Sequence, residues 1–238
     1  MPETSGTSRS VATLIALGAL LYTTWVLELL LATGLDPVQA YVSELSAADQ
    51  PFGGLFRATD LAAGLFVLAG AATALLTPPR RPWCVTGWTA LAVFGLATAV
   101  DSRLPLSCAP TDDPECAARE TAGLVPATHA AHAYSSTLAM AGALAGMAAL
   151  TVAARRYRRW PALARVGPAL LAVELAATVW TLTAVAAFEA GRGIWWLGAG
   201  QRLQVLTVAG WLAVLALSVA RENTGPPGAG RPGTRGTA

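Results

Sequence analysis

The chain has two histidines, and they stand three residues apart at the start of a long apolar stretch. On an α-helix His129, His132 and Ser136 have spacings of i, i+3 and i+7 and share one face. Two such imidazoles can hold zinc or another transition metal when a third ligand, such as Asp101, comes from another helix. A metal-activated water would then suit hydrolysis of a lipid ester or amide. HExxH is absent, so no cofactor is predicted beyond this possibility.

Two cysteines lie just before the histidines in a polar, acidic loop. Cys108 and Cys116 are eight residues apart, and the charge pattern described below places their loop outside the cell. Because that side is oxidising, we predict a disulfide between them. Zinc ligation is the alternative, although the spacing matches no common cysteine motif. Cys84 lies near the opposite surface and is expected to be a reduced packing residue.

The composition indicates lipid as the solvent. Apolar residues make up 54% of the 238 residues and charged residues only 13%, whereas about 25% is usual in globular chains. There is no P-loop, no GxGxxG, no GxSxG and no nucleic-acid-binding module. We therefore predict a protein whose first partner is the lipid bilayer, and which does not bind nucleic acid. The sequence does not identify protein partners.

Six apolar stretches are each long enough for a helix to cross ~30 Å of hydrocarbon. They cover residues 11–33, 57–77, 83–100, 128–153, 163–188 and 199–219. We predict an all-α bundle of six transmembrane helices over residues 11–220, with a disordered start at 1–10. The Gly- and Pro-rich tail at 221–238 is expected to be disordered. Gly142 and Gly146 form a small-xxx-small pattern, which permits close helix approach.

The arginines set the predicted orientation. All sixteen basic residues are arginine. One side of the bundle receives Arg9, Arg80, Arg81, Arg155, Arg156, Arg158, Arg159, Arg221, Arg231 and Arg235. The other side receives mostly acidic residues. Because cytoplasmic loops carry the excess of arginine, we predict a multi-pass protein of the cell membrane with both termini in the cytoplasm.

Tryptophans stand near several span ends. Trp83, Trp88 and Trp160 fall near the arginine-rich side, and Trp195 and Trp196 near the other. This placement is typical of the belts that tryptophan forms at the two membrane surfaces. We assign these residues a structural role.

Polar side chains are concentrated toward the outer ends of the spans, while the inner halves are nearly all apolar. Ionisable residues inside a membrane normally face the bundle interior or a water-filled cavity. We therefore predict an outward-facing polar pocket. Its candidate residues are Glu28, Ser43, Glu44, Arg57, Asp60, Asp101, His129, His132, Ser136, Glu189, Gln201 and Arg202. The alternative is a set of ion pairs and interfacial anchors, with Arg57 paired to Asp60, and Arg202 to Glu189 or Asp101.

Glu174 lies near the middle of the fifth span, far from either surface. An isolated charge there costs on the order of 2.5 kcal/mol or more. One interpretation is a neutral, hydrogen-bonded acid that joins two helices. The other is a step in a proton path.

Several motifs together resemble a known family. They are YVSELS at residues 41–46, DSRLPLSC at 101–108, DPEC at 113–116 and the histidine-led fourth span. Over residues 10–220 the chain resembles the bacterial six-span membrane family "domain of unknown function 998", in its actinobacterial form. In similar sequences an Asp commonly precedes the first loop cysteine, and Ser107 stands there in this chain. The resemblance implies the six-span topology and no particular activity.

These observations leave three functional hypotheses. The first is a non-enzymatic envelope protein that binds a small or lipidic ligand in the outward-facing pocket. The second is a metal-dependent membrane lipid hydrolase built on His129, His132 and outer carboxylates. The third is a proton-coupled small transporter that uses Glu174. No inverted repeat or broken helix pair marks a transport site, and the balance favours a protein that is not an enzyme.

Overall fold

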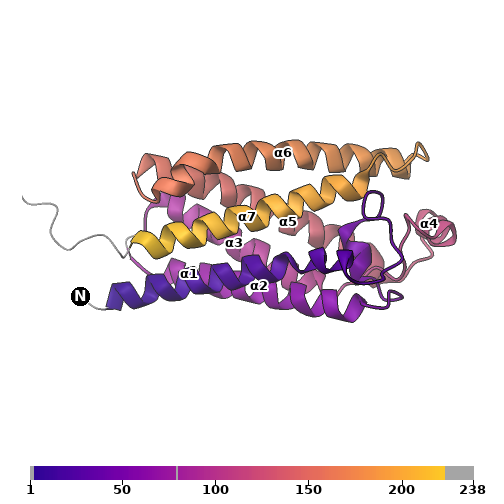
Figure 1. The fold of residues 1–238 in the computed structure, drawn as a ribbon, viewed down its shortest axis with the longest axis horizontal. Helices are drawn as coiled ribbons and strands as arrows, with labels where there is room; N and C mark the ends of the chain where they lie inside the picture. Colours follow the sequence, from indigo (N-terminus) through magenta and orange to yellow (C-terminus); the bar gives the residue numbers. More distant parts are fainter. Residues whose placement is uncertain (1–2, 79, 223–238) are drawn as a thin grey trace, which may run out of the picture.

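Six long helices run side by side along the molecule (Figure 1) in this computed structural model, which describes residues 3–78 and 80–222. They are α1 Glu3–Tyr22, α2 Gly53–Leu76, α3 Pro82–Asp101, α5 Ala127–Arg156, α6 Pro161–Glu189 and α7 Leu197–Glu222. The shorter elements are the 3-10 helices η1 Thr24–Leu29 and η2 Val42–Ser46, and α4 Pro114–Thr121. Six helical segments are long and apolar enough to cross a membrane, and the described residues form no strand. The predicted all-α six-span fold is confirmed.

The first helix differs from its prediction at both ends. It begins at Glu3, so residues 3–10 are helical where a disordered start was predicted. Thr7 and Ser8 line a pocket together with residues at the end of α2, the start of α3 and the end of α7. These neighbours extend the helix beyond its apolar part. At the other end the α-helix stops at Tyr22 and continues as η1. The hydroxyls of Thr23 and Thr24 donate to carbonyls one turn earlier, which favours this change.

The last helix also extends past the predicted span. Arg221 and Glu222, placed in the disordered tail by the sequence, complete α7. The remainder of the predicted tail, residues 223–238, lies outside the described residues. The tight α2–α3 connection carries Pro82 at the first turn of α3, a position where the missing N–H of proline costs no hydrogen bond.

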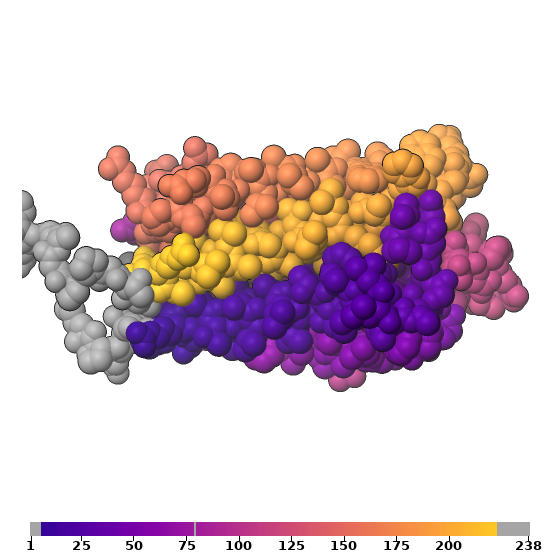
Figure 2. All heavy atoms as spheres, in the orientation of Figure 1, coloured from indigo at the N-terminus to yellow at the C-terminus, as the bar shows by residue number. Residues whose placement is uncertain are grey.

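The six long helices form a closed ring. Each packs against the next long helix in the chain, in the order α1, α2, α3, α5, α6, α7, and α7 returns to α1. Figure 2 shows α1 and α7 in contact along one face of the molecule. We call the end that holds α4, η1 and η2 the disulfide end. The opposite end, with residues 80–81 and 155–159, is the arginine end. Helix α1 begins and helix α7 ends at the arginine end (Figure 1).

The interior of the arginine-end half is apolar. Leu91, Phe94, Met147, Leu150 and Trp211 are almost completely buried there. Trp88 and Trp160 join this core, with their rings edge to face and 6.3 Å apart. They are 5% and 4% exposed, so the predicted belt position is wrong for these two. The indole N–H of Trp160 donates to Glu222 at 3.0 Å, which explains how a tryptophan near the surface is held inside.

Glycines bring neighbouring helix backbones together. A Cβ at Gly142 would lie 2.8 Å from the backbone nitrogen of Phe94, and one at Gly146 would lie 2.8 Å from the Leu91 side chain. The small-xxx-small pattern therefore marks the contact between α5 and α3. A second crossing, between α2 and α3, is made by Gly64 and Gly95. A Cβ on Gly64 would stand 2.6 Å from the Gly95 carbonyl oxygen.

Candidate functional site at the disulfide end

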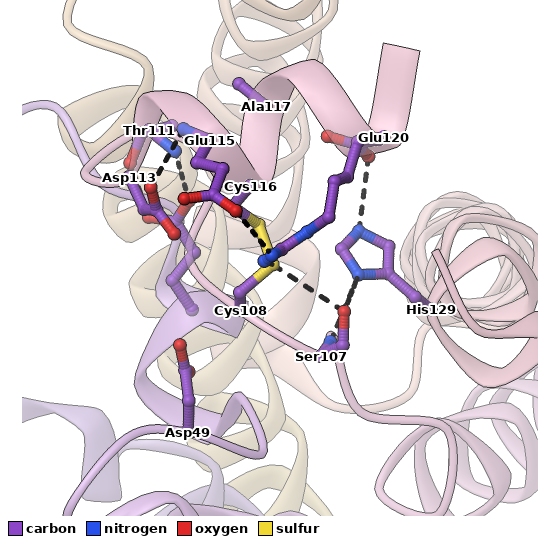
Figure 3. The surroundings of a disulfide bond; sticks show 12 residues. Asp49, Ser107, Cys108, Thr111, Asp113, Glu115, Cys116, Ala117, Glu120 and His129 are labelled. Carbon is purple, nitrogen blue, oxygen red and sulfur yellow. Dashed lines mark hydrogen bonds and ion pairs between the residues drawn. A yellow bond between two sulfur atoms is a disulfide. The ribbon is translucent and has the colours of Figure 1, made fainter. Parts of the chain in front are cut away.

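The loop between α3 and α5 is closed by a disulfide and caps this end of the ring (Figure 3). Cys108 and Cys116 are bonded, with their Cα atoms 6.0 Å apart, which confirms the predicted pairing. Asp113 caps α4 by accepting the N–H of Glu115 at 2.8 Å, as acidic N-caps do. The disulfide thus fixes a short helix above the start of α5.

His129 belongs to this cap. Its Nδ1 accepts the backbone N–H of Ser107 at 3.0 Å and lies 2.9 Å from the Ser107 hydroxyl. Its Nε2 lies 3.4 Å from a carboxylate oxygen of Glu120 (Figure 3). The side chain is 1% exposed. Ser107, where the resemblance led us to expect an Asp, is therefore the hydrogen-bond partner of His129. Both ring nitrogens are engaged by the cap.

Glu44 connects the α1–α2 segment to the disulfide loop. Its carboxylate is fully buried and accepts the backbone N–H of Thr111 at 2.7 Å and the Tyr41 N–H at 3.1 Å. The Thr111 hydroxyl donates to it as well, at 2.5 Å. Burial raises the pKa of Glu44 from its usual 4.5 to about 7, although the hydrogen bonds from Thr111 and Tyr41 oppose the shift. Asp112 adds a smaller upward effect on this pKa.

This raised pKa predicts a pH-dependent stability. The folded chain binds the Glu44 proton more tightly than the unfolded chain, so the contribution of Glu44 is fully present below pH 4.5. It is lost as the pH rises through about 7, by about 1.4 kcal/mol for each unit of pKa difference. Glu44→Gln removes this titration. We expect the melting temperature of the variant to exceed that of the wild type at pH 8, and the excess to shrink toward pH 5.

Glu115→Gln is the matched control, because Glu115 lies in the same cap with 80% of its side chain exposed. Both variants and the wild type would be melted in detergent between pH 5 and pH 8. A difference between Glu44→Gln and the wild type that stays constant over this range would contradict the assignment.

A buried ion pair joins η1 to α7. The guanidinium of Arg202 meets the carboxylate of Glu28 through two bonds of 2.7 and 2.5 Å. Arg202 also donates to the Ala40 carbonyl at 2.7 Å, and both charged residues are 8% exposed. The predicted partners of Arg202, Glu189 and Asp101, are therefore wrong. Glu28 was missed as a partner because the ring closes α1 against α7, a contact that no sequence pattern indicates.

The neighbouring candidate residues form hydrogen bonds with the backbone of the loops. Gln201 accepts the backbone N–H of Val42 at 2.5 Å, and Arg57 donates to the Ser46 and Ala47 carbonyls at 2.6 and 3.1 Å. The Arg57 guanidinium is therefore hydrogen-bonded to backbone carbonyls, and the predicted Arg57–Asp60 pair is wrong. Ser43 is half-buried, and its carbonyl accepts the Ser46 hydroxyl.

Asp101, His132 and Ser135 meet where α3 and α5 approach each other. Nδ1 of His132 lies 3.1 Å from Oδ1 of Asp101, close enough for an ion pair but without the alignment of a hydrogen bond. The Ser135 hydroxyl donates to the same carboxylate oxygen, and Ser136 lies 3.5 Å from it. This is not the arrangement of a catalytic triad, because the serine binds the carboxylate and not the imidazole.

Around this pair, each of the six long helices contributes a polar residue that lies within electrostatic range of a polar residue on another helix. Asp101 and His132 act electrostatically on Asp60, and Asp60, Asp101 and Glu174 all act on Tyr22. Gln204 acts on Glu174 in turn. We call these residues the polar ring: Tyr22, Asp60, Asp101, His132, Glu174 and Gln204, from α1, α2, α3, α5, α6 and α7. Asp60 lies on the same face of α2 as the buried Ala63 and Val67.

Buried polar atoms in and beside the polar ring lack a hydrogen bond. Glu174 is completely buried, and within the described residues neither of its carboxyl oxygens makes a hydrogen bond of normal geometry, although the Gln204 and Thr178 side chains lie beside them. Gln204, the nearest amide, donates to Thr178 at 2.9 Å. The Thr181 hydroxyl and the Trp25 indole N–H, which lie outside the six residues of the polar ring, also have no hydrogen-bond partner in this part of the chain. Nδ1 of His132 makes no hydrogen bond of normal geometry, although it lies 3.1 Å from Asp101. Each such group costs about 1–3 kcal/mol unless water or a ligand satisfies it.

The polar ring holds only part of the predicted set. Asp60, Asp101, His132 and Glu174 converge, while Glu189 is exposed at the end of α6. His129 points into the cap. Tyr22 was not among the predicted residues, because a single tyrosine in an apolar helix carries no distinctive spacing. Ser135 could have been found, since it follows His132 by three residues on one helical face.

The described residues contain no group of three or more metal-ligating side chains. Pockets lie elsewhere in the described part of the chain. One, of about 80 Å³, lies at the arginine end beside Cys84 and Arg159; the other, of about 620 Å³, is an apolar groove between α1 and α7. Cys84 is buried and unbonded. None of the predicted pocket residues lines either of these two spaces.

Comparison with known proteins identifies a family and no activity. A family model described as "Protein of unknown function (DUF998)" matches residues 15–218. No curated protein and no solved structure matches the chain. The resemblance drawn from the loop motifs is therefore confirmed at the level of the family.

Proposed function

The chain belongs to the DUF998 family of membrane proteins, and we propose that the polar ring of this member binds a small or lipidic ligand. The protein is proposed to reside in the cell membrane with both termini in the cytoplasm, because the arginines gather at one end. The disulfide end then faces outward. Its cap covers the ring from the side on which disulfides form.

One observation carries this proposal. The five buried polar atoms without a partner in the described residues belong to Trp25, His132, Glu174 and Thr181. All lie in the middle or the disulfide-end part of their helices, and the arginine-end core is apolar. Unsatisfied groups of this kind are retained when something outside the chain binds them. A ligand that enters from the disulfide end would satisfy them.

Native mass spectrometry of the full-length protein in a mild detergent tests the proposal. We expect wild-type protein to retain a small molecule or lipid, and Glu174→Gln to lower its occupancy about tenfold, which corresponds to about 1.4 kcal/mol. Glu189→Gln is the matched control, because it makes the same change on the same helix at an exposed site. Ligand-free wild type, or equal occupancy in all three proteins, would refute the proposal. Melting curves verify that each variant is folded.

Transport is a second candidate, because Glu174 is an unpartnered acid near the middle of a span. Proton-coupled flux of the retained ligand in vesicles, abolished by Glu174→Gln while binding persists, would favour transport over binding alone. The metal-dependent hydrolase stays a hypothesis with less support, since His129 is engaged by Ser107 and Glu120. Zinc lost from a His129→Ala/His132→Ala double variant in elemental analysis would revive it.

A further inference from the structure

We infer that the polar ring takes a primary ammonium group as the polar end of its ligand. This inference rests on the proposed function, because it names the chemical class of the ligand that the same site binds. It is carried by the charge balance of the polar ring, by the acceptor atoms that lack donors, and by the aromatic surface beside them.

The charge balance is negative. Asp60, Asp101 and Glu174 contribute three carboxyl groups, and His132 is the one basic member. The arginines of the adjoining segments are used elsewhere: Arg202 is paired with Glu28, and Arg57 is bonded to backbone carbonyls. Negative groups that are taken out of water need a positive partner or a proton. An anionic ligand would add to the imbalance, whereas a cation corrects it.

The unsatisfied atoms need donors. Neither oxygen of the completely buried Glu174 makes a hydrogen bond of normal geometry in the described chain, although the Gln204 and Thr178 side chains lie beside this carboxyl. Oδ1 of Asp101 already receives the Ser135 hydroxyl. A primary ammonium brings three N–H donors and no acceptor, so it matches carboxyl oxygens that need donors. A quaternary ammonium has the charge but no donor, and would leave the oxygens of Glu174 unsatisfied.

An aromatic surface adjoins these carboxyls. The ring of Tyr22 lies within electrostatic range of Asp60, Asp101 and Glu174 and stacks edge to face on Phe94, with the centroids 5.4 Å apart. Phe94 is 1% exposed and anchors this pair in the apolar core. Carboxylates beside an aromatic face are a combination that attracts ammonium groups through charge and through the π system.

The ammonium could belong to a lipid headgroup or to a free amine, and one experiment separates the two sources. Full-length protein in maltoside detergent would be incubated with phosphatidylethanolamine, phosphatidylcholine or phosphatidylglycerol of identical acyl chains, and in a separate arm with butylamine. Native mass spectrometry measures the occupancy in each arm. Asp60→Asn removes one carboxylate from the polar ring, and Asp112→Asn is the matched control on the exposed cap. Melting temperatures verify that both variants are folded.

We expect phosphatidylethanolamine to exceed phosphatidylglycerol about tenfold in wild type and in Asp112→Asn, and this preference to disappear in Asp60→Asn. Binding of butylamine with the same dependence on Asp60 would also support the inference and would identify a soluble amine as the ligand. Equal binding of phosphatidylcholine would overturn the primary ammonium. Preference for phosphatidylglycerol, or a preference for phosphatidylethanolamine that stays unchanged in Asp60→Asn, would overturn the cationic class while the proposed binding function survives. No binding of any probe or native ligand would overturn both.

Discussion

Replacing Arg202 with methionine is expected to lower the free energy of unfolding by about 3–5 kcal/mol. The substitution leaves the Glu28 carboxylate, itself 3% exposed as a side chain, without its bidentate partner in a low-dielectric interior. It also removes the donor to the Ala40 carbonyl, so the segment between η1 and η2 loses its tie to α7. Unfolding in mixed micelles, followed by tryptophan fluorescence, measures the loss.

The double variant Glu28→Gln/Arg202→Met provides the control. Because it removes both charges, it leaves no unpaired ion, and we expect it to be more stable than Arg202→Met alone. If the double variant lost as much as the two single variants added together, the two residues would act independently. That result would contradict a direct ion pair between α7 and η1.

Placing a single methyl group on Gly64 is expected to destabilise the fold by about 1–3 kcal/mol or more. The Cβ of Gly64→Ala would stand 2.6 Å from both the Gly95 carbonyl oxygen and the Ala99 backbone nitrogen. These are backbone atoms, so no rotamer change relieves the contact. The helices α2 and α3 would have to separate, which would also move Asp60 away from Asp101. The same unfolding measurement applies.

Gly210→Ala is the matched control, because a Cβ on Gly210 of α7 has nothing within 4 Å. Alanine has a higher helix propensity than glycine by up to about 1 kcal/mol, so we expect no loss of stability there. Equal destabilisation by Gly64→Ala and Gly210→Ala would indicate a general intolerance of larger residues. It would then contradict the close crossing of α2 and α3.

The fold was predictable because a transmembrane segment is recognised from its own hydropathy, independently of the rest of the chain. A stretch such as residues 199–219 is apolar by its own composition, and no other part of the chain is needed to recognise it. The gathering of acids and histidines toward one end was readable for the same reason, since the cost of a charge depends on its depth. The cysteine pair followed from the eight-residue separation and the side of the membrane.

Partners were much less predictable, because they depend on which helices become neighbours. Arg202 was expected to bind Glu189 or Asp101 and instead binds Glu28, 174 residues away in sequence. Arg57 was expected to neutralise Asp60 across one helical turn, but it donates to the backbone carbonyls of the preceding segment, at Ser46 and Ala47. His129 and His132 share a helical face, yet one is bonded by the cap and the other lies against Asp101.

The sequence by itself determined that this chain spans a membrane six times, with polar residues near one end and a disulfide-closed loop there. Those properties are local, since hydropathy and charge are summed over neighbouring residues. Only the tertiary structure decided that α7 returns to α1, that Glu28 is the partner of Arg202, and that Tyr22 and Gln204 complete a ring of six polar residues. Such pairings arise from helix packing, where backbone approach at positions such as Gly64 fixes which side chains meet.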